Sequence, residues 1–179
     1  MTNSESYSII INCKSGEARV LQTLLSSLYE AIDLPKSINI LMNPYYVGYS
    51  PFLDLQDIHH LNFWKNSERV CWFDLWNLYL TQIIRTPLVI MIDDDHVLRT
   101  EDLIQQLNSH FDNNNIRCDW INMSERFGCF ATRTRILTEI CDNPYVSQHQ
   151  SPEDYIKYNL TQPGINIDPY LFRHDRKER

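Results

Sequence analysis

The sequence predicts a three-layer α/β domain built on a mostly parallel central sheet. Apolar, β-branched runs that are typical of buried strands alternate along the chain with segments whose apolar residues recur at helical spacing. The chain has 179 residues, 43% of them apolar, which suits one domain with a substantial core. We therefore expect a single domain over residues 1–179, with frayed ends at 1–6 and 175–179.

The first strand–helix–strand unit occupies the N-terminal part of the chain. The run "YSIIIN" at 7–12 predicts a buried strand. The segment 13–32, "CKSGEARVLQTLLSSLYEAI", places its leucines at helical spacing, and "INILM" at 38–42 predicts the next strand. Because one helical crossover joins these two strands, we expect them to pair in parallel.

The middle of the chain predicts a long loop, a helix, a strand and a second helix. Residues 43–66 are dense in aromatic side chains and follow no sustained period, which is typical of a long functional loop. A helix is expected over 69–84, and the aliphatic run "LVIMI" at 88–92 predicts a strand. Thr100 is the expected N-cap of the next helix, within 99–111.

The last third of the chain predicts further strands and helices. A strand is expected at 119–123 and a loop at 124–130, followed by a helix over 133–141. The letters "SPED" at 151–154 predict a helix start. One or two short strands are expected in "GINIDPYLFRHD", residues 164–175.

Charge and cysteine content exclude several classes of protein. The net charge of −7 leaves no broad basic face for coating nucleic acid, so we expect no nucleic-acid partner. The five cysteines are scattered without a C-x-x-C pair, which argues against a disulfide framework and a zinc site. No apolar run approaches the roughly 20 residues of a membrane span, and no secretory leader is recognisable. We therefore expect a cytoplasmic protein without a membrane span.

A cluster of like charges follows the aliphatic strand in "PLVIMIDDDHVL", residues 87–98. Three adjacent carboxylates repel one another unless water or a cation neutralises them. Alternate side chains of an extended chain point the same way, so Asp93 and Asp95 can converge on Mg²⁺ or Mn²⁺. The alternative is a polar loop that leads into the next helix. Ligands of parallel sheets bind at such strand ends, which favours the cation site.

Four segments together resemble a known enzyme family. The letters "IDDDHVL" look like the metal-binding motif of the GT-A nucleotide-sugar glycosyltransferases, particularly the inverting group called family two. "FGCFATRTRILTEI" is similar to that family's glycine-containing segment, "SPEDYIKYNL" to the motif with its catalytic base, and "GINIDPYLFRH" to its closing strand. The motifs stand in family order, and the resemblance runs from Ser8 to His174. It implies a single GT-A domain, which is a Rossmann-like α/β/α fold.

The resemblance also implies a reaction and a cofactor. A sugar would pass with inversion from a nucleoside-diphosphate sugar, with UDP favoured, to a hydroxyl of an acceptor that the sequence leaves unidentified. Mn²⁺ or Mg²⁺ would neutralise the leaving diphosphate. Asp93, Asp95 and His174 would hold that cation. Asp154 would be the general base, and Glu153 beside it would orient the acceptor or the sugar.

The residues implied in nucleotide-sugar binding lie at strand ends and on helices. They are Asn12, Cys13, Glu17, Asn43, Arg69, Asn77, Asp93, Asp94 and Gly128. Two positions depart from the family pattern. Asn43 stands where an aspartate usually holds the base, and Trp76 stands where an arginine precedes the helix asparagine. The first departure leaves the identity of the nucleotide open.

Simpler interpretations of two motifs remain. "SPED" is also a typical helix start, in which Glu153 and Asp154 complement the helix dipole without any catalytic role. His174 precedes a short basic tail, and a histidine in such a place is by itself more typical of a solvated surface.

Two other functions fit parts of the sequence. "VIMIDDDHV" also matches the nucleophile motif of haloacid-dehalogenase-like phosphatases, in which Asp93 would attack a phosphoryl group beside a bound Mg²⁺. That motif would normally open its domain, whereas more than eighty residues precede it here. The third function is a non-catalytic GT-A domain that binds a nucleotide.

Overall fold

The computed structural model of the chain describes eleven stretches of sequence. They are residues 7–13, 18–31, 33, 39–43, 62–63, 76–112, 118–124, 128–142, 159–160, 165–166 and 171–174. The helices are α1 (Ala18–Glu30), the π-helix η3 (Tyr79–Ile83), α4 (Leu103–Phe111) and α5 (Thr134–Cys141). The strands are β1 (Tyr7–Asn12), β2 (Asn39–Asn43), β3 (Asn62–Phe63), β4 (Leu88–Asp93), β5 (His96–Leu98), β6 (Trp120–Asn122), β7 (Cys129–Arg133), β8 (Ile165–Asn166) and β9 (Phe172–His174).

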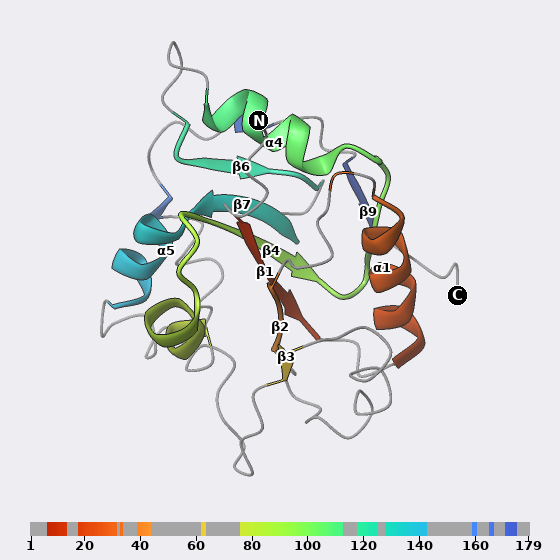
Figure 1. The fold of residues 1–179 in the computed structure, drawn as a ribbon, viewed down its shortest axis with the longest axis horizontal. Helices are drawn as coiled ribbons and strands as arrows, with labels where there is room; N and C mark the ends of the chain where they lie inside the picture. Colours follow the sequence, from red (N-terminus) through yellow and green to blue (C-terminus); the bar gives the residue numbers. More distant parts are fainter. Residues whose placement is uncertain are drawn as a thin grey trace.

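A seven-stranded sheet with the order β3-β2-β1-β4-β7-β6-β8 forms the centre of the fold (Figure 1). β1 pairs in parallel with β2 and with β4, and β2 pairs in parallel with β3. β7 runs antiparallel to both β4 and β6, while β8 returns to the parallel direction beside β6. The predicted α/β class with a mostly parallel sheet is therefore confirmed, with one reversed strand inside the sheet.

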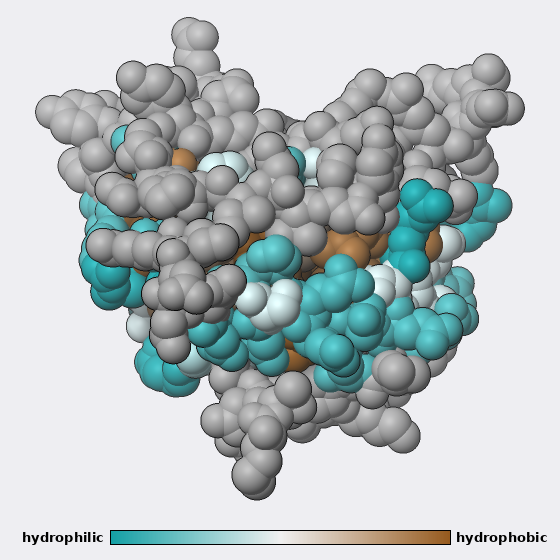
Figure 2. All heavy atoms as spheres, turned by 90° about the horizontal axis from the view of Figure 1, so that it is seen from above, coloured by the Kyte–Doolittle hydropathy of each residue, from teal (hydrophilic) through white to brown (hydrophobic). Residues whose placement is uncertain are grey.

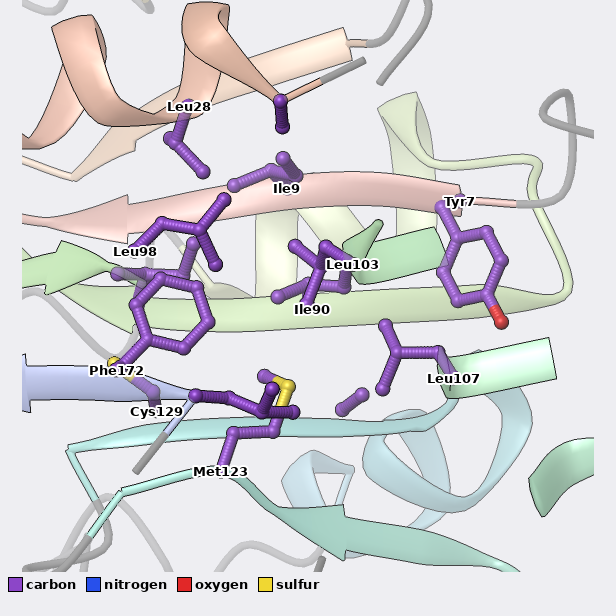
Figure 3. Packing of buried hydrophobic residues seen from close by; sticks show 14 of the residues in the cluster. Tyr7, Ile9, Leu28, Ile90, Leu98, Leu103, Leu107, Met123, Cys129 and Phe172 are labelled. Atoms are coloured by element: carbon purple, nitrogen blue, oxygen red, sulfur yellow. The ribbon is translucent and has the colours of Figure 1, made fainter. Parts of the chain in front are cut away.

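Helices cover both faces of this sheet. On one face, the buried side chains of α1 and α4 pack against alternate residues of β1 and β4, such as Ile9 and Ile90. Figure 3 shows this layer, with Leu103 and Leu107 of α4 lying over the strands. On the other face, Ile10 and Met91 form a second cluster with the η3 segment and α5. The three-layer arrangement follows from strands that are apolar on both sides.

One face of the molecule is polar over much of its described part (Figure 2). Figure 2 shows hydrophilic residues across the face seen from above, the side on which Figure 1 places α4, with apolar residues visible only between them. Among the described residues, Tyr29 is the one large hydrophobic side chain that is exposed, at 44%. No helix in the described stretches has both the length and the apolar content needed to cross a bilayer.

Two sequence expectations are wrong in detail, and one strand was not expected. Cys129 and Phe130, expected in a loop, begin β7, because β6 and β4 on either side supply strand partners that the local sequence does not reveal. The segment after the aspartates forms β5, which pairs with β9 in a separate two-stranded sheet. The N-cap of α4 is Asp102 rather than Thr100, whose hydroxyl donates instead to the Asp102 carboxylate.

Candidate active site

The polar ends of neighbouring strands meet at one edge of the sheet. Asn12, at the end of β1, lies in register with Asn43 at the end of β2 and with Asp93 at the end of β4. Since β7 runs the other way, it begins at this same edge, and the backbone N–H of Asp93 donates to the carbonyl of Gly128 at 2.9 Å. The edge therefore combines three strand ends with one strand start, which is the position where α/β sheets bind ligands.

A buried hydrogen-bonded chain leads to Asp93. The indole Nε1–H of Trp76 donates to Oδ1 of Asn12 at 2.7 Å, and Nδ2 of Asn12 donates to Oδ1 of Asp93 at 3.1 Å. Trp76 is only 2% exposed and Asn12 only 3%. Sequence reasoning missed Trp76 as a contributor to the site. Its one signal was that it stands where the family pattern has an arginine.

The aspartate turn alternates between buried and accessible side chains. Asp94 is fully buried at 0% exposure, and its backbone N–H donates to the carbonyl of Asn12 at 3.0 Å. Asp93 and Asp95 on either side are partly exposed, the side chain of Asp95 to 36%. The two outer carboxylates are thus the ones that reach the surface of the edge, while Asp94 lies behind it.

Two buried thiols lie close to the aspartates. Burial raises the pKa of Cys13 well above its ordinary value, and the carboxylates of Asp94 and Asp93 raise it further. The pKa of Cys129 is likewise raised, first by burial and then by the charge of Asp93. Both thiols therefore stay protonated near neutral pH, which removes them as nucleophiles.

His96 and Gly128 form a tight contact beside the turn. His96 is 3% exposed, and its Nδ1 lies 2.8 Å from Oδ1 of Asp95. A Cβ atom on residue 128 would come within 2.8 Å of the His96 Nε2, closer than real Cβ contacts allow. The backbone N–H groups of Gly128 and Cys129 both donate to Oγ of Ser124, each at 3.0 Å, which holds this strand start in place.

Some of the remaining residues that the sequence predicts for the site lie within the described stretches, and others do not. His174 pairs with His96 through the β9 backbone, which brings it alongside the aspartate turn, although its side chain lies outside the description. Asn77 follows Trp76 on the helical turn, and its buried Oδ1 accepts no hydrogen bond from any described residue. Of Asn43 only the backbone is described. Four further predicted residues lie outside the described residues, namely Glu17, Arg69, Glu153 and Asp154.

The described part of the edge offers a partial set of metal ligands. Within the stretches that the structure describes, no three side chains of His, Cys, Asp or Glu are grouped so as to hold a metal ion. Two partly exposed carboxylates, Asp93 and Asp95, stand there, and carboxylate oxygens with water and phosphate in the other positions suit Mg²⁺ or Mn²⁺. The donor chemistry therefore fits the cation that the sequence predicts.

No protein-family model matches the sequence, and no curated protein sequence is similar enough to count as a match. Solved structures, in contrast, share its fold. A cytidylyltransferase from Leptospira borgpetersenii superposes with a TM-score of 0.61 at 14% identity over 91% of this chain and 76% of its own. A mannosyltransferase from Pyrobaculum calidifontis, solved with GDP-Man and Mn²⁺, gives 0.64 at 13% identity over 91% of this chain and 55% of its own.

A mouse xyloside xylosyltransferase superposes with a TM-score of 0.58 at 11% identity, over 90% of this chain and 85% of its own. Identities this low establish the fold alone. The chain spans little more than half of the mannosyltransferase but most of the other two proteins. Its architecture is thus the Rossmann-like α/β fold that GT-A glycosyltransferases share with nucleotidyltransferases.

Proposed function

We propose that the protein is a metal-dependent, inverting glycosyltransferase that takes its sugar from a nucleoside-diphosphate sugar. One observation carries the proposal: Asn12 and Asp93 end adjacent parallel strands in register, directly before a turn that exposes a second aspartate. This arrangement occurs in a fold shared with nucleotide-sugar transferases, at the edge where such sheets bind ligands.

Asp93 and Asp95 are the proposed ligands of the cation, with His174 as the third. Both carboxylates are partly exposed, whereas Asp94 between them is fully buried. A bound Mn²⁺ or Mg²⁺ supplies Lewis-acid stabilisation of the charge that develops on the leaving diphosphate. Asp94 supports the turn from inside, because its backbone ties the turn to the end of β1.

Asp154 and Glu153 are the proposed groups that act on the acceptor. Asp154 takes the proton of the acceptor hydroxyl, whose oxygen forms a bond to the anomeric carbon. The bond between that carbon and the diphosphate oxygen breaks in the same step, and the nucleoside diphosphate leaves with the electron pair. A single displacement of this kind inverts the configuration and requires no enzyme nucleophile. Protonated, buried thiols at this edge agree with that expectation.

The nucleotide is proposed to lie over the ends of β1 and β2. Asn43 ends β2 beside Asn12, and Asn77 carries a buried acceptor without a described donor. We propose UDP as the favoured nucleotide, with Glu17, Arg69 and Gly128 as further contacts. The side chains of Asn12 and Cys13 are buried, so they shape the floor of this edge rather than its surface.

Nucleotidyl transfer is a second candidate, because a cytidylyltransferase shares the fold over 76% of its own length. The same two carboxylates would serve a nucleoside triphosphate equally well, since both reactions neutralise phosphate charge through a cation. The two reactions differ in their products, because glycosyl transfer releases a nucleoside diphosphate and nucleotidyl transfer releases pyrophosphate.

A thermal-shift panel of nucleotides with and without Mn²⁺ tests the proposal at the level of binding. A ligand that binds only the native state at about 100 times its Kd adds about 2.7 kcal/mol of stability. We expect nucleoside diphosphates and their sugars, UDP compounds above all, to raise the Tm only when Mn²⁺ is present. The D95N variant should lose this shift while its Tm without ligands stays near that of the wild type.

Product analysis then separates the reactions. Release of UDP from a UDP-sugar supports glycosyl transfer, and release of pyrophosphate from a nucleoside triphosphate with a sugar phosphate supports nucleotidyl transfer. Phosphate release from a simple phosphomonoester, abolished in D93N, would instead support the phosphatase. Metal-dependent binding of a nucleotide without turnover of any of these substrates would support a non-catalytic nucleotide-binding domain. Absence of a metal-dependent Tm shift with every nucleotide contradicts the proposed function.

A further inference from the structure

We propose that Trp76 is a positioning residue for the cation site, acting on Asp93 through the side-chain amide of Asn12. The inference rests on the proposed function, because it assigns Asp93 to the cation. Trp76 itself would contact neither the cation nor the nucleotide sugar. Its indole N–H would fix the amide of Asn12 in the one orientation that donates to Asp93.

The contacts form an unbroken chain from the helix to the carboxylate. The indole nitrogen of Trp76 lies 2.7 Å from Oδ1 of Asn12, and Nδ2 of the same amide lies 3.1 Å from Oδ1 of Asp93. Both distances fall within the normal range for hydrogen bonds between nitrogen and oxygen. The sequence separations are 64 and 81 residues, so the chain joins three elements that only the tertiary fold brings together.

Two hydrogen bonds set the orientation of the Asn12 amide. An asparagine amide has an accepting oxygen at one end and a donating NH₂ group at the other, and rotation by half a turn exchanges them. The indole of Trp76 can only donate, so it requires the oxygen to face it. The NH₂ group must then face Asp93, where it meets an oxygen of the carboxylate.

Burial makes this orientation costly to lose. Trp76 is 2% exposed and Asn12 is 3% exposed, so water cannot readily replace the indole. Without it, the amide loses the donor that holds its oxygen away from Asp93, and in the reversed orientation two oxygens would face each other. The Asp93 carboxylate would then lose the donor that Asn12 supplies. Partners one layer behind a metal ligand typically tune metal affinity in this way.

A second contact ties the same segments together. The backbone carbonyl of Asn12 accepts the N–H of Asp94, at 3.0 Å. Asn12 therefore holds the aspartate turn through its backbone and the Asp93 carboxylate through its side chain. This backbone hydrogen bond does not involve the Trp76 side chain. A variant at position 76 therefore tests only the side-chain hydrogen bonds from Trp76 through Asn12 to Asp93.

The first experiment observes the hydrogen bond without reference to activity. The chain has four tryptophans, so its indole N–H region in an NMR spectrum contains few signals, and W76F assigns one of them by removing it. We expect that signal to exchange slowly with solvent in the wild type. Mn²⁺, a paramagnetic ion, should broaden it well before the indole signal of Trp120, which pairs with Thr132 away from the Asp93 end of β4. Equal broadening of the two signals, or no broadening in a protein that binds Mn²⁺, overturns the proposal.

The second experiment measures Mn²⁺ affinity in the presence of UDP. W76F keeps an aromatic ring and removes only the donor, and we expect it to weaken Mn²⁺ binding about tenfold. W120F makes the same chemical change in a partly buried tryptophan of the same core cluster and should bind Mn²⁺ like the wild type. N12A removes the donor to Asp93 and should also weaken binding about tenfold.

The double variant separates positioning from general structural damage. If Trp76 acts through Asn12, W76F combined with N12A should bind Mn²⁺ no more weakly than N12A alone. The reason is that the effects of substitutions within one hydrogen-bonded network do not add. Additive losses, or a folded W76F with an affinity within twofold of the wild type, overturn the proposal. Should W76F fail to fold, the N12A affinity and the wild-type broadening decide. A wild type that binds no Mn²⁺ at all contradicts the proposed function instead.

Discussion

The imidazole of His96 packs directly against the α-carbon of Gly128, at the point where β7 starts beside the aspartate turn. A side chain on residue 128 would meet Nε2 of this ring at 2.8 Å and Nδ1 at 3.2 Å. Nδ1 of the same ring lies 2.8 Å from Oδ1 of Asp95. Only glycine leaves enough space for the ring at this position. A larger residue at 128 would displace the His96 ring and with it the contact to Asp95, a proposed metal ligand.

Replacement of Gly128 by alanine should destabilise the protein by about 1–3 kcal/mol, the usual cost of overpacking a filled site. The reason is that the added methyl group and the His96 ring would occupy the same space. The free energy of unfolding in urea measures the effect. H96A in the same chain should relieve the clash, so the double variant should lose less than the sum of the two single losses. Additive losses would show that the contact is not the cause.

Asp102 holds the N-cap position of α4 without a capping side-chain hydrogen bond, and the distant Asp33 should supply the side-chain acceptor for the first turn instead. Its Oδ2 accepts the backbone N–H of Gln105 at 2.7 Å, in the first turn of the helix. D33A should lower the free energy of unfolding by about 1 kcal/mol, whereas D33N, which keeps an acceptor oxygen, should lose less. T100A is the matched control, and a loss from T100A that exceeds the loss from D33A would contradict this assignment.

Asp154 should be needed for turnover and not for binding. With UDP-sugar as donor, D154N should reduce transfer at least a hundredfold, because general bases typically contribute about 10²–10⁴ to the rate. The Mn²⁺-dependent Tm shift with UDP should remain, since Asp154 is assigned to the acceptor. The measurements are UDP release and the thermal shift on the same preparation. Unchanged transfer would exclude Asp154 as the base, and loss of both signals would point to a structural role.

The described cysteines should resist modification until the protein unfolds. Cys13, Cys118, Cys129 and Cys141 are all free and buried. Burial raises the pKa of Cys141 from 9.0 to about 12, and the pKa values of Cys13 and Cys129 are raised as well. Mass spectrometry after brief alkylation at pH 8 should find these four thiols unmodified. Rapid labelling of Cys13 or Cys129, the two thiols beside the aspartates, would mean that the site edge opens in the native state.

The same shifts predict a loss of stability in alkali. Cysteines ionise near pH 9.0 in the unfolded chain but remain protonated at that pH in the folded protein. The native state then binds more protons than the unfolded state, so the free energy of unfolding falls as the pH rises above about 9. Urea unfolding at pH 7, 9 and 10 measures the slope. C141S should reduce the slope, because it removes one of the contributing thiols.

Sequence patterns predicted the elements whose signal is local. The aliphatic runs at 7–12 and 88–92 correspond to β1 and β4, and the helices expected within 13–32 and over 133–141 correspond to α1 and α5. In each, the apolar spacing matches the burial, so chain pattern and tertiary packing agree. β7 and β5 were missed because short strands depend on partners that the local sequence does not name.

The candidate site was predictable only where its residues stand in local sequence motifs. Asp93, Asp95 and Gly128 stand in contiguous motifs, and the fold does bring their segments to one edge. The buried chain from Trp76 to Asn12 joins residues 64 positions apart, and no spacing rule connects them. A tryptophan in an apolar helix face is ordinarily counted as core, so its single N–H goes unnoticed until a structure shows what accepts it.

The antiparallel strand β7 brings the connection between β6 and β7 to the edge of the sheet that carries the aspartate turn. β6 and β7 form a hairpin in which Asn122 pairs with Phe130, so the connection between them lies at the same rim as the aspartate turn. Ser124 joins the two ends of that connection. It follows β6 in the sequence, and its Oγ accepts the backbone N–H groups of Gly128 and Cys129 at the start of β7. A hairpin loop can change in length and sequence without shifting the strands that carry it. Exchange of residues between Ser124 and Gly128 should therefore leave the strand ends that carry Asp93 and Asn12 in place.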